Sequence, residues 1–484
     1  MEHSKRMNWD KLLCPARFDD SSTHDTRDVR SPFQKDIDRI VFSSHFRRLG
    51  RKTQVHPLNE NDHIHTRLSH SIETSSVGRS LGQHVGILLK KNSELPNSIA
   101  EEHVGQIVQA ACLAHDIGNP PFGHAGEAAI KSWFKSKKQA LTSDPILLGT
   151  KTLLLSLPIP SDIIKTITES IAQNAAEASG INALITKDQC GDFLKFDGNA
   201  MAFRVVTKTG FDAGSNGMRP TYAMLGAMLK YPYLSEYADK DKFGCFLSEK
   251  DILVRAAKEL GLLKHHGGQD RYSRHPLAYL VEAADDICYR IMDIEDGVEL
   301  RLVQSDFLYE KIYKNHSHED AGEFQKGATR TVNSKIRAKI MQECIFEIVH
   351  CFEANYDAIM RGEFEGSLME CVSNNDSVCK TVMSQYSILS NDLFLSRRKV
   401  ELEIGARMTI GRLLDCFLSI VGDICNGSPH EAENQVAVFL GKDKFDQLKE
   451  QADCPYNAFL LALDYVTGMT DHYAVVLSKR FAGL

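Results

Sequence analysis

Four side chains of types that bind divalent metal ions stand far apart along the chain. His70 comes first, the adjacent His115 and Asp116 follow, and Asp285 comes much later. A catalytic metal needs several nitrogen and oxygen ligands from rigid elements, with open positions for water or substrate. Two histidines and two carboxylates would supply such a set. The chain has 19 histidines, and a single histidine is more often a core or surface residue than a ligand, so both interpretations stay open at this point.

Two pairs of residues separated by three positions point to further chemistry, because such residues share one face of a helix. Arg67 precedes His70, and a guanidinium beside a metal could hold a phosphate; the alternative is a surface ion pair. His124 precedes Glu127, and a carboxylate that orients a histidine makes a candidate acid–base pair. The alternative for this second pair is an incidental contact on a solvated helix.

A stripe of polar residues follows the last of the four candidate ligands. Asp285, Tyr289 and Asp293 are spaced by four residues each, so on a helix they form one continuous line. Carboxylates beside apolar residues are unusual on a core face. One of them could hold metal while the next two residues meet a polar ligand; the alternative is a hydrogen-bonded contact between helices.

Basic residues gather in two places, although a solvated face is the default interpretation of such groups. The pair Lys230–Tyr231 and the later Lys242 flank a polar loop. A short basic run comprises Arg47, Arg48, Arg51 and Lys52.

Apolar periodicity predicts the helices that must position these side chains. We expect a helix over about 67–89, whose glycines at 78, 82 and 86 should allow close packing on another helix. Apolar positions over 104–112 predict a second helix that ends near His115, and positions 277–288 predict a third. We find no alternating strand ladder and no repeat. The expected fold is all-α, with at most one short β-hairpin over 203–218.

Composition limits the class of protein. The chain has 484 residues, of which 43 % are hydrophobic and 25 % charged, which excludes a mainly disordered or fibrous chain. The net charge of −7 gives no global argument for binding nucleic acid or membranes, so an anion site must be a local basic cluster. No apolar run reaches the ~18 residues of a membrane span, the N-terminus lacks the apolar stretch of a signal peptide, and the 12 cysteines form no CxxC pair. We therefore expect a cytoplasmic protein with reduced thiols.

Seven segments resemble, in order along the chain, the motifs of the deoxyguanosinetriphosphate triphosphohydrolase family within the HD-domain superfamily of metal-dependent phosphohydrolases. They are RSPFQKDIDRI (30–40), HTRLSHSIE (65–73), AHDIGNPPFGHAGEAAI (114–130), FDGNAMAFRV (196–205), TYAMLGAMLKYP (221–232), RHPLAYLVEAADDICY (274–289) and DYVTGMTDHYA (464–474). The 114–130 segment is specific, whereas a bare His–Asp dipeptide would not be.

The resemblance implies a mainly helical HD-domain core with an N-terminal extension over 1–310, and a helical C-terminal region over 311–484 packed on that core. It implies hydrolysis of a deoxynucleoside triphosphate (dNTP), with dGTP favoured, at the α-phosphorus to a deoxynucleoside and inorganic triphosphate. The implied cofactor is Mn²⁺ or Mg²⁺, and other transition metals also suit these ligands. The implied assembly is a homo-oligomer, a tetramer or hexamer built from dimers.

The resemblance also assigns roles by position. The implied metal ligands are His70, His115, Asp116 and Asp285. The implied acid–base pair is His124 and Glu127. The implied substrate contacts are Arg67, Asn199, Lys230, Tyr231 and Lys242 at the triphosphate, Tyr289 and Asp293 at the sugar, and Gln54 and Val55 near the base and the sugar edge.

Three positions depart from the family pattern. Asp197 and Met201 stand where glutamate and glutamine are more frequent, and His472 stands where arginine is common. These departures leave the metal ligands unchanged and bear on base preference, effector response and subunit contacts. Two alternatives stay open. The first is another HD-type phosphodiesterase or nucleotidase. The second is a nucleotide-sensing or single-stranded-DNA-binding regulator with little turnover, which the basic run at 47–52 supports weakly.

Overall fold

The computed structural model describes most of the chain, and all structural statements below concern the described residues. These are 6–17, 27–55, 61–142, 185–208, 217–238, 240–265, 270–316, 329–372, 377–394, 397–425, 437–438, 441, 445–446, 450 and 454–484. Within them the regular elements are helices, and extended backbone pairs only in isolated bridges. The all-α expectation is confirmed.

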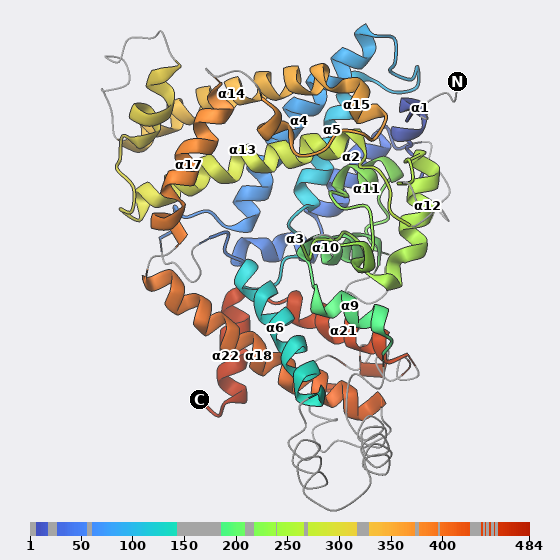
Figure 1. The fold of residues 1–484 in the computed structure, drawn as a ribbon, viewed down its shortest axis with the longest axis vertical. Coiled ribbons are helices and arrows are strands. Elements are labelled where there is room, and N and C mark those ends of the chain that lie inside the picture. Colours follow the sequence, from blue (N-terminus) through green and yellow to red (C-terminus); the bar gives the residue numbers. More distant parts are fainter. Residues whose placement is uncertain are drawn as a thin grey trace, which may run out of the picture.

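Three predicted helices form the centre of the molecule (Figure 1). They are α4 (Arg67–Lys91), α5 (Glu101–Ala114) and α13 (Pro276–Glu299). Helix α4 begins where the Thr66 hydroxyl accepts a hydrogen bond from the backbone N–H of Ser69, which satisfies one free donor of the first turn. The expected close packing of its glycines is also confirmed, because a β-carbon at Gly82 would lie 2.8 Å from the carbonyl oxygen of Val104 on α5.

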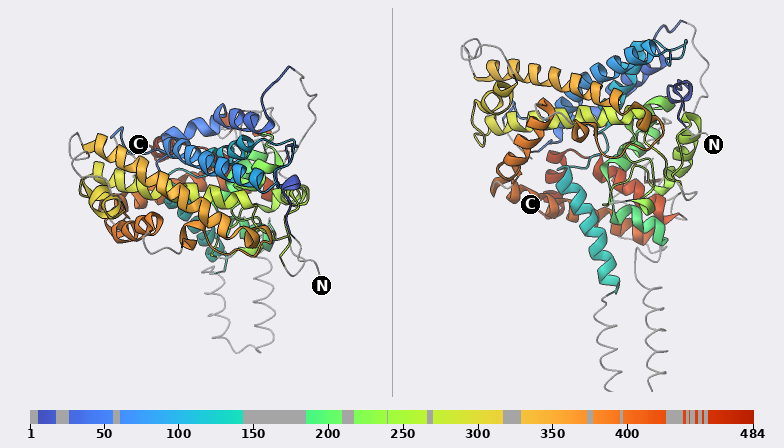
Figure 2. Two further views of the ribbon diagram at one scale, coloured as in Figure 1. Left: turned by 90° about the horizontal axis from the view of Figure 1, so that it is seen from above. Right: turned by 45° about the horizontal axis from the view of Figure 1, so that its top comes forward.

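Helix α13 carries the polar stripe across a largely apolar environment. Pro276 occupies its first turn, where no backbone donor is needed. Its buried residues include Leu280, Ala284 and Ile287, which pack toward α4 and α5. Figures 1 and 2 show α14 (Thr329–Ala354) running beside α13, and α17 (Val378–Phe394) packs on α13 as well.

A second group of helices lies below this layer in Figure 1. Helix α18 packs on three of its neighbours, α6, α21 and α22. The group comprises α6 (His124–Thr142), α9 (Lys187–Leu194), α18 (Arg397–Cys425), α21 (Pro455–Thr467) and α22 (Asp471–Phe481). The remaining helices are α1 (Trp9–Leu12), α2 (Pro32–Val41), α3 (Ser44–Arg48), α10 (Gly198–Thr207), α11 (Tyr222–Met228), α12 (Lys250–Leu260), α15 (Tyr356–Met360) and α16 (Leu368–Cys371), with short turns η1 (Leu49–Arg51), η3 (Ser235–Tyr237), η4 (Leu247–Glu249), η5 (Leu308–Ile312) and η6 (Tyr313–Asn315).

The part of the chain after residue 310 is divided between the two groups of helices. Helix α14 packs on α4 and α13, whereas α18 packs on α6. The division into 1–310 and 311–484 stays a prediction. None of the helices described here combines the length and the apolar character needed to cross a membrane.

The hairpin expected over 203–218 is wrong where the structure describes it. Phe203 to Thr207 form the end of helix α10, and residues 209–216 lie outside the described residues. The helix begins where the Asp197 carboxylate accepts a hydrogen bond from the backbone N–H of Asn199. Its apolar side chains, among them Phe203 and Val206, are fully buried. Burial on every side removed the amphipathic period that would have identified this helix in the sequence.

Candidate active site

The two histidines and Asp285 meet at the centre of the molecule. His70 lies on α4, His115 ends α5, and Asp285 lies on α13. One ligand atom from each of the three lies within 4.8 Å of the other two. Nε2 of His70 is 2.9 Å from Oδ1 of Asp285, and Nε2 of His115 is 3.5 Å from the same oxygen. Such a set of two imidazoles and a carboxylate is typical of a metal centre.

The tautomer of His115 fits a metal ligand. Its Nδ1 lies 2.6 Å from the carbonyl oxygen of Cys112, so Nδ1 carries the proton and Nε2 presents a lone pair. That Nε2 is buried and makes no hydrogen bond within the described part of the chain. A buried polar atom without a partner is rare, and a histidine whose other nitrogen is fixed by a carbonyl is typical of metal sites. The residues present therefore fit a divalent cation.

Asp116 adjoins this cluster and also faces a permanent cation. Its Oδ1 is 3.6 Å from Nε2 of His115, and its Oδ2 accepts a hydrogen bond of 2.6 Å from Nη1 of Arg67. The side-chain amide of Asn119 donates to Oδ1. Burial raises the pKa of Asp116, but Arg67 and His115 outweigh that effect and lower it. The carboxylate therefore stays ionised beside the cluster.

The carboxylates of Asp116 and Asp285 create a negative electrostatic potential in the cluster, which favours a bound positive charge. Burial lowers the pKa of His115, yet Asp116 and Asp285 raise it to about 9. Burial likewise opposes ionisation of Asp285, but the neighbouring His115 and His70 lower its pKa well below the usual value. The field that would hold a proton on His115 also favours a divalent cation at this position.

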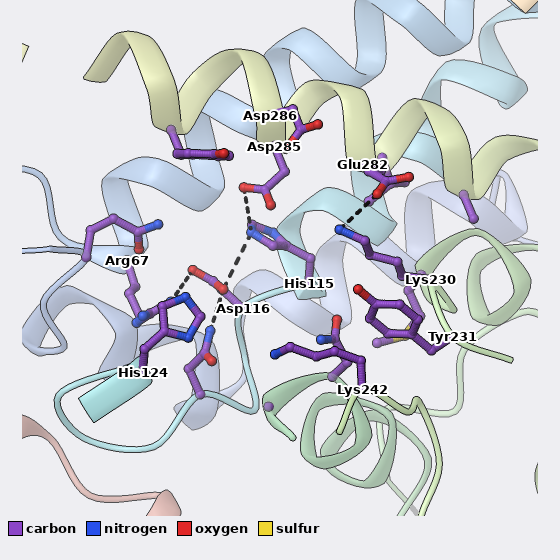
Figure 3. A pocket seen from close by; sticks show the side chains of 18 of the residues that line it. Arg67, His115, Asp116, His124, Lys230, Tyr231, Lys242, Glu282, Asp285 and Asp286 are labelled. Carbon is purple, nitrogen blue, oxygen red and sulfur yellow. Dashed lines mark hydrogen bonds and ion pairs between the residues drawn. The ribbon is translucent and has the colours of Figure 1, made fainter. Parts of the chain in front are cut away.

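A cavity of about 390 Å³ opens beside the cluster and is of a size that holds a small ligand. Figure 3 shows Asp285, Asp286 and Glu282 projecting from α13 on one side, with Lys230, Tyr231 and Lys242 across from them. His70 is fully buried and does not line the cavity. Every other residue of the predicted site lines it, namely Gln54, Val55, Arg67, His115, Asp116, His124, Glu127, Asn199, Lys230, Tyr231, Lys242, Asp285, Tyr289 and Asp293.

His124 is placed at the rim by a tight loop. It is the first residue of α6, and its side chain is 88 % exposed. Phe122 and Gly123 before it have φ angles of 65° and 55°, the left-handed region that favours glycine. A β-carbon at Gly123 would also collide with the Arg67 guanidinium. Glycine at position 123 therefore suits both the backbone conformation and the position of the Arg67 guanidinium.

Glu127 is held as a buried carboxylate beside His124. Its Oε2 is 3.4 Å from Nδ1 of His124, and its Oε1 accepts a hydrogen bond of 2.9 Å from the backbone N–H of Gly198. Lys242 lies 3.9 Å away. Burial raises the pKa of Glu127, but His124 and Lys242 outweigh it and lower the pKa to about 2. An ionised Glu127 can hold the His124 ring in position through this contact.

Two lysines supply positive charge across from the cluster. Nζ of Lys230 is 3.0 Å from Glu282, and Nζ of Lys242 is 3.4 Å from Asp197. Burial lowers the pKa of each lysine, and the nearby carboxylates outweigh it and raise both values. Both lysines are therefore cationic at neutral pH and can hold a phosphate chain. The side-chain amide of Asn199 donates to Asp197 at 2.8 Å.

The far end of the α13 stripe is aromatic. A rise of 1.5 Å per residue puts Asp293 about 12 Å along the helix from Asp285. The hydroxyl of Tyr386 donates to Oδ2 of Asp293 at 2.7 Å, and its ring lies edge-on to the ring of Tyr289, with the centroids 5.5 Å apart. Burial raises the pKa of Tyr289 to about 12, so its hydroxyl stays protonated.

Several cavity residues were not identified in the sequence. Tyr386 comes from α17, about 100 residues after the stripe that it meets, so no spacing linked the two. Asn119 lies inside the motif at 114–130, where its position next to Asp116 could have been a signal. Glu282 and Asp286 flank Asp285 on α13, and both line the cavity.

The basic run at 47–52 does not form one exposed patch. Arg47 and Arg51 are exposed and Arg48 is partly buried. Lys52 is 3 % exposed, and its ammonium donates to the carbonyl oxygens of Asn119 and Thr467. The default interpretation of this run as a solvated face is therefore wrong for Lys52. Of the three departures from the family pattern, Asp197 begins α10, Met201 is fully buried and His472 is exposed.

Comparisons with known proteins identify the family of this chain. An HD-domain family model matches residues 67–176. The chain is 35 % identical to a deoxyguanosinetriphosphate triphosphohydrolase-like protein of Pseudomonas aeruginosa, with 99 % of each chain covered. It is 32 % identical to a protein of the same description from Synechocystis sp., over 99 % of this chain and all of the relative.

A relative named deoxyguanosinetriphosphate triphosphohydrolase, from Klebsiella pneumoniae, is 30 % identical over 86 % of this chain and 82 % of its own length. The HD-domain match and the donor set of the cluster make the chain a metal-dependent phosphohydrolase. On the identity and coverage of these relatives, the chain belongs to the deoxyguanosinetriphosphate triphosphohydrolase family of HD-domain proteins.

Proposed function

We propose that the protein hydrolyses a dNTP, with dGTP favoured, at the α-phosphorus to a deoxynucleoside and inorganic triphosphate. One observation supports this most: a single cavity combines a His/Asp cluster, two lysines and an arginine, and an exposed histidine paired with a buried carboxylate. A triphosphate carries several negative charges, so its cleavage depends mainly on positioning and charge neutralisation. The names of the relatives support dGTP as the substrate.

The metal would be held by His70, His115, Asp116 and Asp285. When bound, it would withdraw electron density from the phosphoryl group and promote ionisation of the attacking water. We propose Mn²⁺ or Mg²⁺, because carboxylates and a phosphate chain suit these ions and imidazole suits the first of them.

The triphosphate would lie against the basic side chains of the cavity. Arg67, held in place by Asp116, would contact the chain beside the metal. Lys230 and Lys242 would offset the negative charge of the triphosphate while water attacks the α-phosphorus and the 5′-oxygen of the deoxynucleoside leaves. Tyr231 and Asn199 would contribute neutral hydrogen-bonding groups at the same end.

His124 would transfer the proton, with Glu127 as its partner. The imidazole is exposed at the rim of the cavity, so a substrate can reach it, while Glu127 is buried and ionised behind it. A protonated His124 would give its proton to the oxygen that leaves, and Glu127 would stabilise the imidazolium before that transfer. Loss of Glu127 should therefore reduce proton transfer by His124 without displacing the metal.

The sugar would lie at the aromatic end of the α13 stripe. Tyr289 and Asp293 would meet the deoxyribose, where close packing would sense the missing 2′-hydroxyl. Gln54 and Val55 would lie near the base and the sugar edge. Tyr386 would join them through its hydrogen bond to Asp293.

Product identification tests this proposal. The purified protein is incubated with each of the four dNTPs, singly and in pairs, with Mn²⁺ or Mg²⁺, and the products are identified by mass spectrometry. We expect deoxyguanosine and triphosphate from dGTP. Release of phosphate or a monophosphate would instead support another HD-type phosphodiesterase or nucleotidase. Nucleotide binding without any turnover, in single or paired nucleotides, would support a regulator.

A matched pair of variants ties the activity to the cluster. Asp116→Asn should abolish triphosphate release. Asp192→Asn replaces a carboxylate that is equally buried but lines no part of the cavity, and should retain release. Full activity in Asp116→Asn would remove Asp116 from the site.

We further propose a homo-oligomer, a tetramer or hexamer built from dimers, which light scattering of the purified protein tests. Binding of single-stranded DNA is the weaker candidate, since only Arg47 and Arg51 of the basic run are exposed. Such binding should fall steeply with salt. A cytoplasmic location would agree with a nucleotide substrate.

A further inference from the structure

The segment between α21 and α22, residues 467–471, does not line the cavity but contacts segments that do. Asp471 is 3 % exposed. Its Oδ2 accepts hydrogen bonds from the backbone N–H and the hydroxyl of Thr53, at 2.9 and 2.7 Å. Its Oδ1 accepts a hydrogen bond of 2.9 Å from the backbone N–H of Phe122. One carboxylate thus joins two segments that are separated by almost 70 residues of chain.

Each partner of Asp471 stands next to residues of the proposed site. Thr53 immediately precedes Gln54 and Val55, which line the cavity. Phe122 lies two residues before His124 and has a φ angle of 65°, a conformation that a bulky residue adopts only when its surroundings impose it. The hydrogen bond to Asp471 is a contact of this kind, because it fixes the peptide of Phe122 itself.

Lys52 ties the same three segments together a second time. Its ammonium donates to the carbonyl oxygen of Asn119 at 2.6 Å and to that of Thr467 at 2.7 Å. Asn119 in turn donates to Asp116. The end of α21, the segment after η1 and the loop before α6 are therefore held as one unit beside the cavity.

We propose that Asp471 is a positioning residue for the reaction, acting through Gln54 at the nucleoside end and His124 at the phosphate end. This inference rests on the proposed function, because it assigns Asp471 a role in that turnover. The competing account is a purely structural carboxylate. Asp192 provides the comparison, because it accepts hydrogen bonds from the Leu247 backbone N–H and from the hydroxyls of Ser235 and Tyr456 and touches no cavity segment.

The variants Asp471→Asn and Asp192→Asn separate the two accounts. An amide nitrogen cannot accept a hydrogen bond, so Asp471→Asn must lose its bonds either to Thr53 or to Phe122. We expect both variants to lower the melting temperature by a similar few degrees. We expect kcat for dGTP to fall about tenfold or more in Asp471→Asn, since small misplacements of reacting groups are costly, and to change less than about twofold in Asp192→Asn. Equal kcat in the two variants would overturn the proposal.

A variant that removes fewer hydrogen bonds separates the role of Asp471 at the nucleoside end from its role at the phosphate end. Thr53→Val removes only the hydroxyl donor and leaves the bond between Asp471 and Phe122 in place. It should raise KM through the segment of Gln54 while kcat stays close to wild type. A loss of kcat as large as in Asp471→Asn, with unchanged KM, would contradict the assignment of the Thr53 contact to the nucleoside end.

Hydrogen exchange tests the positioning even if the wild type turns over no dNTP, in which case the proposed function alone has failed. Amide exchange is followed by mass spectrometry in peptides that cover 51–55 and 117–124. Asp471→Asn should exchange faster than wild type in at least one of the two peptides, and Asp192→Asn in neither. Unchanged exchange in both peptides of Asp471→Asn would overturn the proposal whatever the activity.

Discussion

Two of the buried ionic clusters in the described part of the chain differ in charge, because only one of the two is balanced by its own side chains. In the first, Arg204 pairs with Glu249 at 2.7 Å and with Asp464 at 2.8 Å. Lys208 reaches Glu249 at 2.7 Å. Two permanent cations thus face two carboxylates, and the cluster joins α10 to η4 and α21.

The second cluster has two carboxylates and one permanent cation. Asp116 is paired with Arg67, whereas Asp285 faces only the two histidines. Nε2 of His115 makes no hydrogen bond in the part of the chain that the structure describes. This difference in charge balance shows that burial of charged side chains is not by itself a sign of function. The missing positive charge distinguishes the cluster that can accept a metal from the one that holds helices together.

The largest effect should come from Asp285→Asn, which removes the carboxylate that faces both histidines. We expect loss of measurable Mn²⁺ binding by calorimetry and a fall in kcat/KM of about a thousandfold, or about 4 kcal/mol in barrier height. The metal-free protein should also lose some stability, because Asp285 helps to raise the pKa of His115, but the loss should be smaller than where a permanent cation loses its partner. Retained Mn²⁺ affinity would contradict the assignment of metal binding to this cluster.

Glu249→Gln should give the opposite pattern. It leaves Arg204 and Lys208 with one carboxylate between them, and we expect the free energy of unfolding to fall by about 3 kcal/mol in urea titrations. Mn²⁺ affinity should stay at the wild-type value. A loss of metal binding without a loss of stability would show that the two clusters are not separate in role.

Glu127→Gln should change how stability depends on pH. The folded-state pKa of Glu127 is about 2, lowered from 4.5. Its ionised form therefore contributes stability that is complete above pH 4.5 and is lost as the pH falls toward 2. Urea unfolding of wild type and variant from pH 6 downward should show the difference between them shrinking by up to about 3 kcal/mol. Parallel pH profiles would contradict an ionised, stabilising Glu127.

The smallest effect should come from Tyr386→Phe, which removes the hydroxyl that donates to Asp293. We expect KM for dGTP to rise about fivefold, close to the 1 kcal/mol of one hydrogen bond, with kcat nearly unchanged. The control is Tyr279→Phe, because the hydroxyl of Tyr279 donates to the carbonyl oxygen of Phe364 outside the cavity. Equal KM values in the two variants would remove Tyr386 from the nucleoside end.

The sequence predicted those parts of the molecule that carry a local signal. The apolar periodicity over 104–112 and 277–288 identified α5 and α13, because each helix buries one face, and the helix expected over 67–89 is α4. The spacing of Asp285, Tyr289 and Asp293 was likewise readable, since it is set by a single helix. Helix α10 was missed in part, because its side chains are buried on all sides.

Contacts between distant segments had no such signal. Tyr386 meets Asp293, and Asp471 meets Thr53 and Phe122, across separations that only the packed fold defines. Lys52 stood in a basic run that looked solvated, yet its ammonium is buried on two carbonyl oxygens. Residue type did not predict that burial lowers the pKa of Lys52 to about 7, nor did it predict the partners of these groups.

The central claim is that the charge-deficient cluster binds one divalent cation. Crystals grown with Mn²⁺ and measured near the manganese absorption edge test it most directly. The account predicts one anomalous peak within about 2.3 Å of ligand atoms from His70, His115 and Asp285, with Asp116 completing the set. An empty cluster at millimolar Mn²⁺, or a peak bound elsewhere while these side chains keep their mutual contacts, would contradict it.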